Sequence, residues 1–153
     1  MDNPNDPARY AWRRANAGRV LSRALHRFEA RVLDLMREAG HAELRRSQVN
    51  LTRHLDTDGT RITELARRAA MTNAAMTELI DQCTACGLVE RLADPRDRRA
   101  RIVRFTPAGL AWLDAFGVAV AQAQQEMADE VGPEALRRML RALGRYAGGD
   151  EGA

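Results

Sequence analysis

The chain has 153 residues, of which 45% are hydrophobic and 29% are charged, a composition typical of a folded soluble protein. This length suffices for one domain with its own core, or for one domain with additional dimerisation helices. No apolar run approaches the roughly 18 residues of a membrane span, and the polar start Met1 to Arg9 has no apolar signal core. We therefore expect a cytoplasmic protein that does not associate with membranes.

Basic charge is concentrated in one short stretch of the chain. All 24 basic residues are arginine, and the net charge is only +3. Residues 89–104, however, contain six arginines and three acidic residues, so this stretch alone carries as much net charge as the whole chain. A local excess of this kind favours a polyanion as the partner.

The spacing of apolar residues predicts four helices in the first 86 residues. Residues 1–7 are predicted to form a disordered arm, because they hold two prolines, two asparagines and two aspartates. Helices are then predicted over about 8–38, 45–55, 60–68 and 72–86. In the last of them, four apolar side chains recur at i, i+3, i+4 and i+7 and define one buried face: Met76, Leu79, Ile80 and Cys83.

Two short strands, 88–92 and 101–105, are predicted to flank the basic sequence ADPRDRRA. Thr106 followed by Pro107 then begins a long helix, with Leu110 on its apolar side. Gly132-Pro133 ends that helix, and a last helix follows.

The predicted fold is mainly α with a small β-hairpin wing. Two helices joined by a tight turn and followed by a basic hairpin are typical of a winged helix-turn-helix. The long first helix and the last two helices have more apolar surface than a lone winged helix covers, so we expect N- and C-terminal dimerisation helices. The predicted domains are a disordered arm (1–7), an N-terminal dimerisation helix (8–40), a winged helix-turn-helix DNA-binding domain (41–105), C-terminal dimerisation helices (106–148) and a disordered tail (149–153).

Several motifs occur here in an order that resembles the MarR family of bacterial transcription regulators. The resemblance covers about Thr60 to Leu113, and the helix order extends it over nearly the whole chain. GLVER leads into the wing, and Thr106-Pro-Ala-Gly109 matches the family's Thr-x-x-Gly. The most specific motif is the family's Asp-x-Arg-Asp-x-Arg, matched by Asp94, Arg96, Asp97 and Arg99.

The resemblance implies a homodimer that binds a near-palindromic operator in double-stranded DNA, usually as a repressor, and that a small-molecule ligand or oxidation releases. It places the wing at residues 93–100, with Arg99 in the minor groove, where arginine feels an enhanced negative potential. Asp97 would orient Arg99 through a charge-assisted hydrogen bond, and Arg96, Arg98 and Arg101 would lie along the phosphates. Alternatively, Asp97 and Arg99 only hold the hairpin together and the other arginines are solvated.

The helix predicted over 72–86 would be the recognition helix, and it departs from the family because it has no basic residue and its only charges are Glu78 and Asp81. Family members commonly carry a basic residue at the position of Asn73, and often at that of Glu78. Asn73 can read adenine, Glu78 can accept from cytosine N4, and the alanines can contact thymine methyl groups. Arg67 and Arg68 are expected to hold the helix on the DNA backbone. The outward-facing residues are Thr72, Asn73, Ala74, Ala75, Thr77 and Glu78.

Two alternatives to a ligand-released regulator remain open. The missing basic residues favour a winged-helix scaffold that binds proteins and does not read DNA. Cys83 and Cys86 favour a thiol-based redox-responsive regulator, although Cys83 takes the place of a core leucine and a disulfide within one helical turn is strained.

A small-molecule effector is expected in a cleft where the first two helices and the fifth meet the DNA-binding domain. Its candidate lining residues, each more often a packing or surface residue, are Trp12, His26, His41 and His54. No two histidines lie at i, i+3 or i, i+4, and no phosphate loop or nucleophile motif occurs. We therefore predict no metal site, no cofactor and no enzymatic activity.

Overall fold

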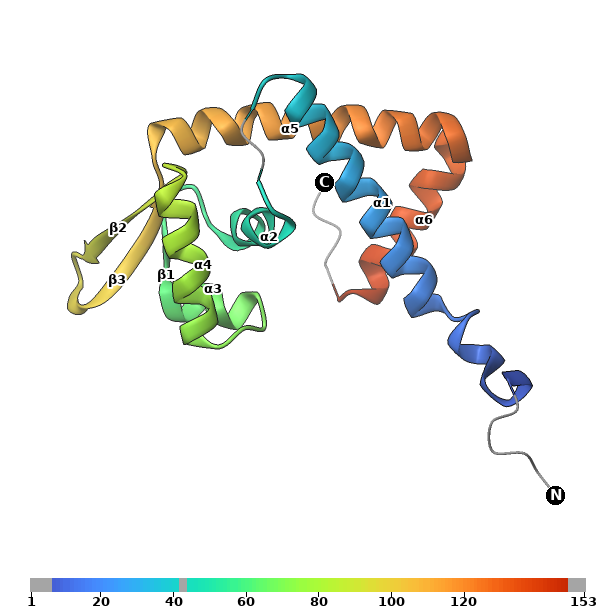
Figure 1. The fold of residues 1–153 in the computed structure, drawn as a ribbon, viewed down its shortest axis with the longest axis horizontal. Coiled ribbons are helices and arrows are strands. Elements are labelled where there is room, and N and C mark those ends of the chain that lie inside the picture. The colour runs from blue at the N-terminus through green and yellow to red at the C-terminus, as the bar shows by residue number, and fades with distance from the viewer. Residues whose placement is uncertain (1–6, 42–43, 149–153) are drawn as a thin grey trace. The chain divides into compact units, whose positions relative to one another are not determined.

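A computed structural model describes residues 7–41 and 44–148 of the chain (Figure 1). Contacts divide it into two compact units, each described here by itself: a helical unit (residues 7–34 and 120–148) and a winged unit (residues 35–41 and 44–119). In the described residues, no helix is long and apolar enough to cross a membrane. The elements in chain order are η1 (Pro7–Arg13), α1 (Ala17–Glu38), α2 (Arg46–His54), β1 (Thr60–Arg61), α3 (Ile62–Arg68), α4 (Asn73–Ala85), β2 (Val89–Asp94), β3 (Asp97–Phe105), α5 (Pro107–Val131) and α6 (Pro133–Tyr146).

The winged unit combines α2, α3 and α4 with a three-stranded antiparallel sheet in the order β1-β3-β2. Side chains from the helices and from the sheet form its core, among them the fully buried Leu51, Leu65 and Val103. The apolar face predicted for α4 is confirmed, since all four of its residues are buried. The β2–β3 hairpin projects beyond the helices (Figure 1). The predicted class, mainly α with a small winged sheet, is therefore confirmed.

The two strands of the hairpin extend further toward its tip than predicted. Its strands pair from Val89 opposite Phe105 as far as Ala93 opposite Arg101, and the register then shifts before Asp94 pairs with Asp97. Only Pro95 and Arg96 form the turn. Most of the segment predicted as a loop is thus strand, because solvated arginines do not prevent backbone pairing along an exposed edge.

Two predicted helices begin differently from expectation. The helix predicted from residue 8 is divided into η1 and α1, because Asn16 caps α1: its Oδ1 accepts from Arg19 N at 3.0 Å. Its Nδ2 donates to Trp12 O at 2.9 Å and so also closes η1. The helix predicted from Thr60 begins two residues later, since Thr60 and Arg61 pair with β3 as strand β1. Pro7, predicted to belong to the arm, begins η1, and the remaining terminal predictions, 1–6 and 149–153, lie outside the described residues.

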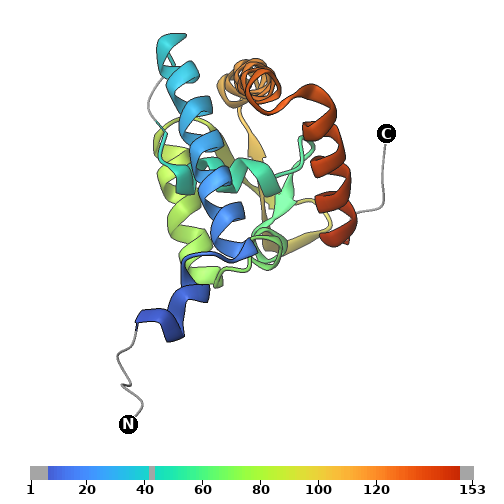
Figure 2. The same cartoon turned by 90° about the vertical axis from the view of Figure 1, so that its right-hand side faces the viewer.

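The helical unit contains most of α1, the second part of α5, and α6. Gly132, with φ +92°, and Pro133 separate α5 from α6 as predicted, and α6 turns sharply away from α5 in both views (Figures 1 and 2). Ala123 and Leu136 are buried in this unit. Many of the other apolar side chains are exposed, however, and they include Val20, Leu21, Leu25, Met139 and Leu140.

In the part of α5 that belongs to the winged unit, the buried aromatic residue is Trp112. Its side chain is only 6% exposed and stacks on Phe116 with ring centroids 4.8 Å apart. Leu110, predicted to lie on the apolar side, is 41% exposed. Sequence spacing predicted the helix, but it did not identify Trp112 as the buried aromatic residue.

Candidate nucleic-acid interface

The turn between α3 and α4 fixes the start of the predicted recognition helix. Ala70 N donates to Arg67 O at 3.2 Å, in a helix ending that requires a left-handed residue. Ala70 supplies it with φ +52°. Thr72 then caps α4, since its Oγ accepts from Ala75 N at 3.1 Å. The Thr72 hydroxyl thus has a structural partner at the outward-facing end of α4.

The outward face of α4 is open to a ligand. Of the six residues predicted to face outward, five are exposed and Thr77 is half-buried. The central positions of this face are Ala74 and Glu78, one turn apart and opposite the buried side. A short, uncharged first turn followed by a single carboxylate is small enough for close approach to base edges in a major groove.

Asp94 organises the wing from within. Its side chain is 3% exposed; Oδ1 accepts from the backbone N–H of Arg96 at 2.8 Å, and Oδ2 accepts from Arg61 Nε at 2.6 Å. Two hydrogen bonds hold the pKa of Asp94 below its usual value, although burial alone would raise it. The larger effect comes from the Arg96 backbone N–H, and the smaller one from the Arg61 guanidinium. The first aspartate of the motif therefore shapes the hairpin and ties it to β1.

Sequence reasoning missed Arg61 as part of this site. Arg61 lies 33 residues before Asp94 in the chain, and no local motif connects the two. Strand β1 brings them together by placing Arg61 opposite Ile102 of β3. Only knowledge of the sheet order could have identified the pair.

The hydrogen bond of Asp97 differs from the predicted one. Its Oδ1 accepts from the backbone N–H of Arg99 at 3.0 Å, whereas the predicted bond was to the Arg99 guanidinium. The aspartate thus stabilises the first residues of β3. The guanidinium of Arg99 is exposed and makes no hydrogen bond or salt bridge with any residue in the described part of the chain.

Two of the six arginines in the basic stretch form salt bridges with other residues of the winged unit. Arg91 reaches from β2 to α4, where it pairs with Asp81 Oδ1 at 2.6 Å and donates to Thr77 O at 3.0 Å. Arg104 pairs with Glu90 across the β2–β3 ladder at 2.7 Å. Both acidic partners are therefore compensated before any ligand binds.

The other four arginines give the wing its outward charge. All four are exposed. The guanidinium of Arg101 donates to Arg98 O at 3.4 Å, and the others have no side-chain hydrogen bond or salt bridge to a residue that the structure describes. The hairpin thus presents a cluster of cations whose nearby carboxylates already have partners. These arginines are Arg96, Arg98, Arg99 and Arg101.

Arg67 and Arg68, predicted to hold α4 on the DNA backbone, both bond Glu64 on the same helix, at 2.7 and 2.8 Å. These two hydrogen bonds lower the pKa of Glu64 to about 2. Arg68 also donates to Asp56 at 2.8 Å and to His54 O at 3.0 Å. Arg68 is therefore mainly a structural residue, whereas the more exposed Arg67 has free donors to offer an anion.

The Thr106-x-x-Gly109 motif has a structural explanation. Thr106 Oγ donates to Gly87 O at 2.6 Å and accepts from Gly109 N at 2.9 Å. A Cβ added at Gly109 would lie 1.9 Å from Leu88 O, so only glycine allows α5 to begin this close to β2. The motif therefore holds the base of the wing.

The two cysteines are free and differ in environment. Cys83 is fully buried, and desolvation, followed by the nearby Cys86, raises its pKa to about 11. Such a thiol is unreactive at neutral pH. Cys86 is exposed at the end of α4, where its Sγ accepts from Gln48 Nε2 at 3.5 Å.

The four predicted ligand-lining residues are not gathered within either unit. Trp12, 65% exposed, and His26, on the exposed side of α1, belong to the helical unit. His41 and His54 belong to the winged unit. A site shared by them stays a prediction. Among the described residues, no group of histidine, cysteine, aspartate or glutamate is arranged to hold a metal ion.

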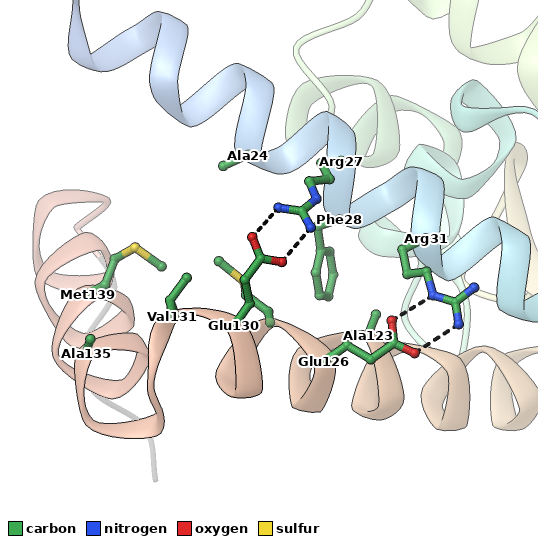
Figure 3. Close-up of a pocket in the computed structure, with 11 residues that line it drawn as sticks. Ala24, Arg27, Phe28, Arg31, Ala123, Glu126, Glu130, Val131, Ala135 and Met139 are labelled. Carbon is green, nitrogen blue, oxygen red and sulfur yellow. Dashed lines mark hydrogen bonds and ion pairs between the residues drawn. The ribbon is translucent and has the colours of Figure 1, made fainter.

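The helical unit has a pocket of its own, of about 420 Å³, between α1, α5 and α6 (Figure 3). Arg27 makes two hydrogen bonds to Glu130, at 2.7 and 2.5 Å, and Arg31 makes two to Glu126, at 2.7 and 2.9 Å. Phe28 lies between the two ion pairs and points toward α5. A second, more apolar groove of about 540 Å³ continues along the same three helices.

The helix-turn-helix, the three-stranded sheet and the cationic hairpin define a winged helix-turn-helix protein. Residues 49–100 match the sequence profile described as the MarR family. No curated protein sequence matches the chain significantly.

Solved structures share this fold over most of the chain. Wild-type apo MarR from E. coli has a TM-score of 0.70 and 19% identity, over 86% of this chain and 97% of its own. The transcriptional repressor CouR, bound to a 23-mer DNA duplex, has a TM-score of 0.69 and 21% identity, over 96% and 99%. NadR in complex with 4-hydroxyphenylacetate has a TM-score of 0.65 and 19% identity, over 87% and 93%. The chain is therefore similar to the MarR family: residues 49–100 match its sequence profile, and the solved structures share the winged-helix fold.

Proposed function

We propose that the chain is a homodimeric, sequence-specific DNA-binding repressor that a small-molecule effector releases from its operator. The observation that carries this proposal is the cation cluster of the wing. Four exposed arginines lie in the same unit as the open face of α4, and the carboxylates Glu90, Asp94 and Asp97 around them are occupied by bonds inside the fold. Such a surface suits a polyanion with a groove.

In this proposal the winged unit is the DNA-binding domain. The outward face of α4 enters the major groove, and Arg99 enters the adjacent minor groove, whose negative potential attracts a guanidinium. Arg96, Arg98, Arg101 and Arg67 contact phosphates and supply the salt-dependent part of the affinity. CouR, which has the same fold, is known bound to a DNA duplex, and this supports DNA as the partner.

The helical unit is proposed to form the homodimer. Its apolar groove is lined by Leu21, Leu25 and Leu140, which remain 40–47% exposed in the single chain. An apolar surface of this extent is typical of an interface. A second copy related by a two-fold axis would present two recognition helices to half-sites about 34 Å apart.

The effector is proposed to be a small organic molecule. NadR, which shares the fold, is known in complex with 4-hydroxyphenylacetate. A redox response would instead use Cys86, the more exposed thiol. We propose no enzymatic activity, and a location in the cytoplasm with the DNA.

Selection of genomic fragments by the purified protein tests the proposal. The selection is done at about 0.15 M salt, the physiological ionic strength. We expect enrichment of fragments that share an inverted repeat with half-sites about one helical turn apart. Weak binding that is blind to sequence and disappears as salt rises would contradict sequence-specific reading. That result would favour a winged-helix scaffold for protein partners.

A further inference from the structure

The recognition helix carries two acidic residues, and the structure separates their roles. Asp81 is compensated by Arg91 of β2 at 2.6 Å. Glu78, one turn earlier, is exposed and has no hydrogen bond or ion pair with any residue of the described chain. Since Arg91 is held by Asp81 and by Thr77 O, no cation of this face is left for Glu78. Its carboxylate is the single uncompensated charge on the outward face of α4.

An uncompensated carboxylate in a DNA groove needs a donor. It is repelled by the phosphates and by the base acceptors, so binding is favourable only where it meets an exposed N–H group. The major groove offers two such groups, cytosine N4 and adenine N6. In adenine, the acceptor N7 lies beside N6 and matches the paired donor and acceptor of an amide side chain. Cytosine has no acceptor beside N4, and its edge therefore suits a carboxylate better.

The position of Glu78 fits this contact. It lies at the centre of the outward face, one turn from Ala74, whose methyl group leaves room for a base edge. The uncharged residues at the start of α4 provide no competing cation. By contrast, an arginine here would select guanine through its O6 and N7 acceptors.

We propose that Glu78 determines operator specificity by accepting a hydrogen bond from a cytosine N4 amino group, once in each half-site. This inference rests on the proposed DNA-binding function and adds to it the base that α4 requires. The operator thus contains a G·C pair that faces Glu78, and the cytosine of this pair lies nearer to α4 than the guanine does. The wing supplies affinity, and Glu78 supplies discrimination against other bases.

Base preferences of three variants test the inference. Wild type, Glu78→Gln and Glu78→Ala are each used to select from a pool of randomised duplexes built on an inverted repeat. We expect wild type to favour cytosine at one position of each half-site by about tenfold. Glu78→Gln should move that preference toward adenine, and Glu78→Ala should remove it, with the other positions unchanged. The matched control is Asp81→Asn, which should keep the wild-type preference because Asp81 faces Arg91.

Three outcomes are distinguishable. The expected shift at a single position, absent in Asp81→Asn, supports the inference. A wild-type repeat that Glu78→Gln and Glu78→Ala select unchanged overturns the role of Glu78 and leaves DNA reading intact. If no protein selects a repeat, the proposed function fails and the inference fails with it. Circular dichroism of each variant checks folding, which an exposed side chain without partners should not affect.

Discussion

At the scale of single residues, the wing motif divides into residues that shape the hairpin and residues that remain outside it. Asp94 and Asp97 both accept backbone N–H groups, of Arg96 and Arg99 respectively. The arginine side chains at these two positions are left exposed. The pattern of the motif allowed its location and charge to be predicted. The direction of each aspartate bond was not predictable, because it depends on the register of the hairpin.

Replacing Asp94 by asparagine is expected to destabilise the protein in a pH-dependent manner. The amide cannot form the ion pair with Arg61, and it is a weaker acceptor for the Arg96 N–H. The folded-state pKa of Asp94 lies below its ordinary value, which is about 3.9. The stabilisation is therefore fully present above that value and is lost as the pH falls through the depressed pKa.

Urea denaturation between pH 7 and pH 3 measures this effect. Wild type should be more stable than Asp94→Asn near neutral pH, and the difference in the free energy of unfolding should shrink toward the acid end. A difference of the same size at every pH would contradict a contribution from the Asp94 charge.

At the scale of elements, three helices end within the winged unit with a left-handed residue. The left-handed residue is Gly40 after α1 (φ +83°), Gly87 after α4 (φ +71°) and Ala70 after α3 (φ +52°). Glycine at the first two positions allowed those ends to be predicted from sequence. The third end was placed correctly only because the helix pattern stops, since alanine gives no signal for a left-handed turn.

Ala70→Gly is expected to stabilise the protein. A left-handed alanine costs roughly 1–2 kcal/mol, while glycine adds unfolded-state entropy of about 0.5–1 kcal/mol. The net gain in the free energy of unfolding should be about 0.5–1 kcal/mol, with base preference unchanged. Thermal denaturation followed by circular dichroism measures it, and a lower melting temperature would show that Ala70 carries no strain.

Gly109→Ala tests the contact between α5 and β2. The added Cβ meets the Leu88 carbonyl, so we expect destabilisation by about 1–3 kcal/mol, typical of overpacking. The control is Gly117→Ala in the same helix, where no neighbouring atom lies within 4 Å of the new Cβ. That change should instead stabilise by about 0.5–1 kcal/mol. Equal effects of both substitutions would contradict a close approach at Gly109.

Local sequence patterns predicted most of the helices and the presence of the hairpin. They failed where long-range pairing decides the structure: Thr60 and Arg61 become a strand only because β3 lies beside them. The same reason explains the missed Arg61–Asp94 pair in the candidate site. The exposed face of α4 was predictable, since the helical period that buries Ile80 also directs Glu78 outward.

At the scale of the whole molecule, the central expectation is a dimer formed by the helical unit. Leu140, 45% exposed on α6, lines the apolar groove of this unit. Leu140→Glu should produce monomers, because it introduces a charge into the interface. Arg138→Gln, on the same helix, changes the net charge equally and should remain dimeric. Sedimentation equilibrium distinguishes the two variants. A dimeric Leu140→Glu protein would show that the interface lies elsewhere.

The most direct measurement is the affinity of the protein for its selected operator and for a scrambled duplex of equal length. Fluorescence anisotropy at about 0.15 M salt should show binding to the operator on the order of 10³-fold tighter or more. Arg99→Ala should weaken operator binding by about tenfold while leaving the dimer intact. Equal affinity for the two duplexes, or a folded dimeric Arg99→Ala protein that binds as tightly as wild type, would contradict DNA reading by α4 and the wing.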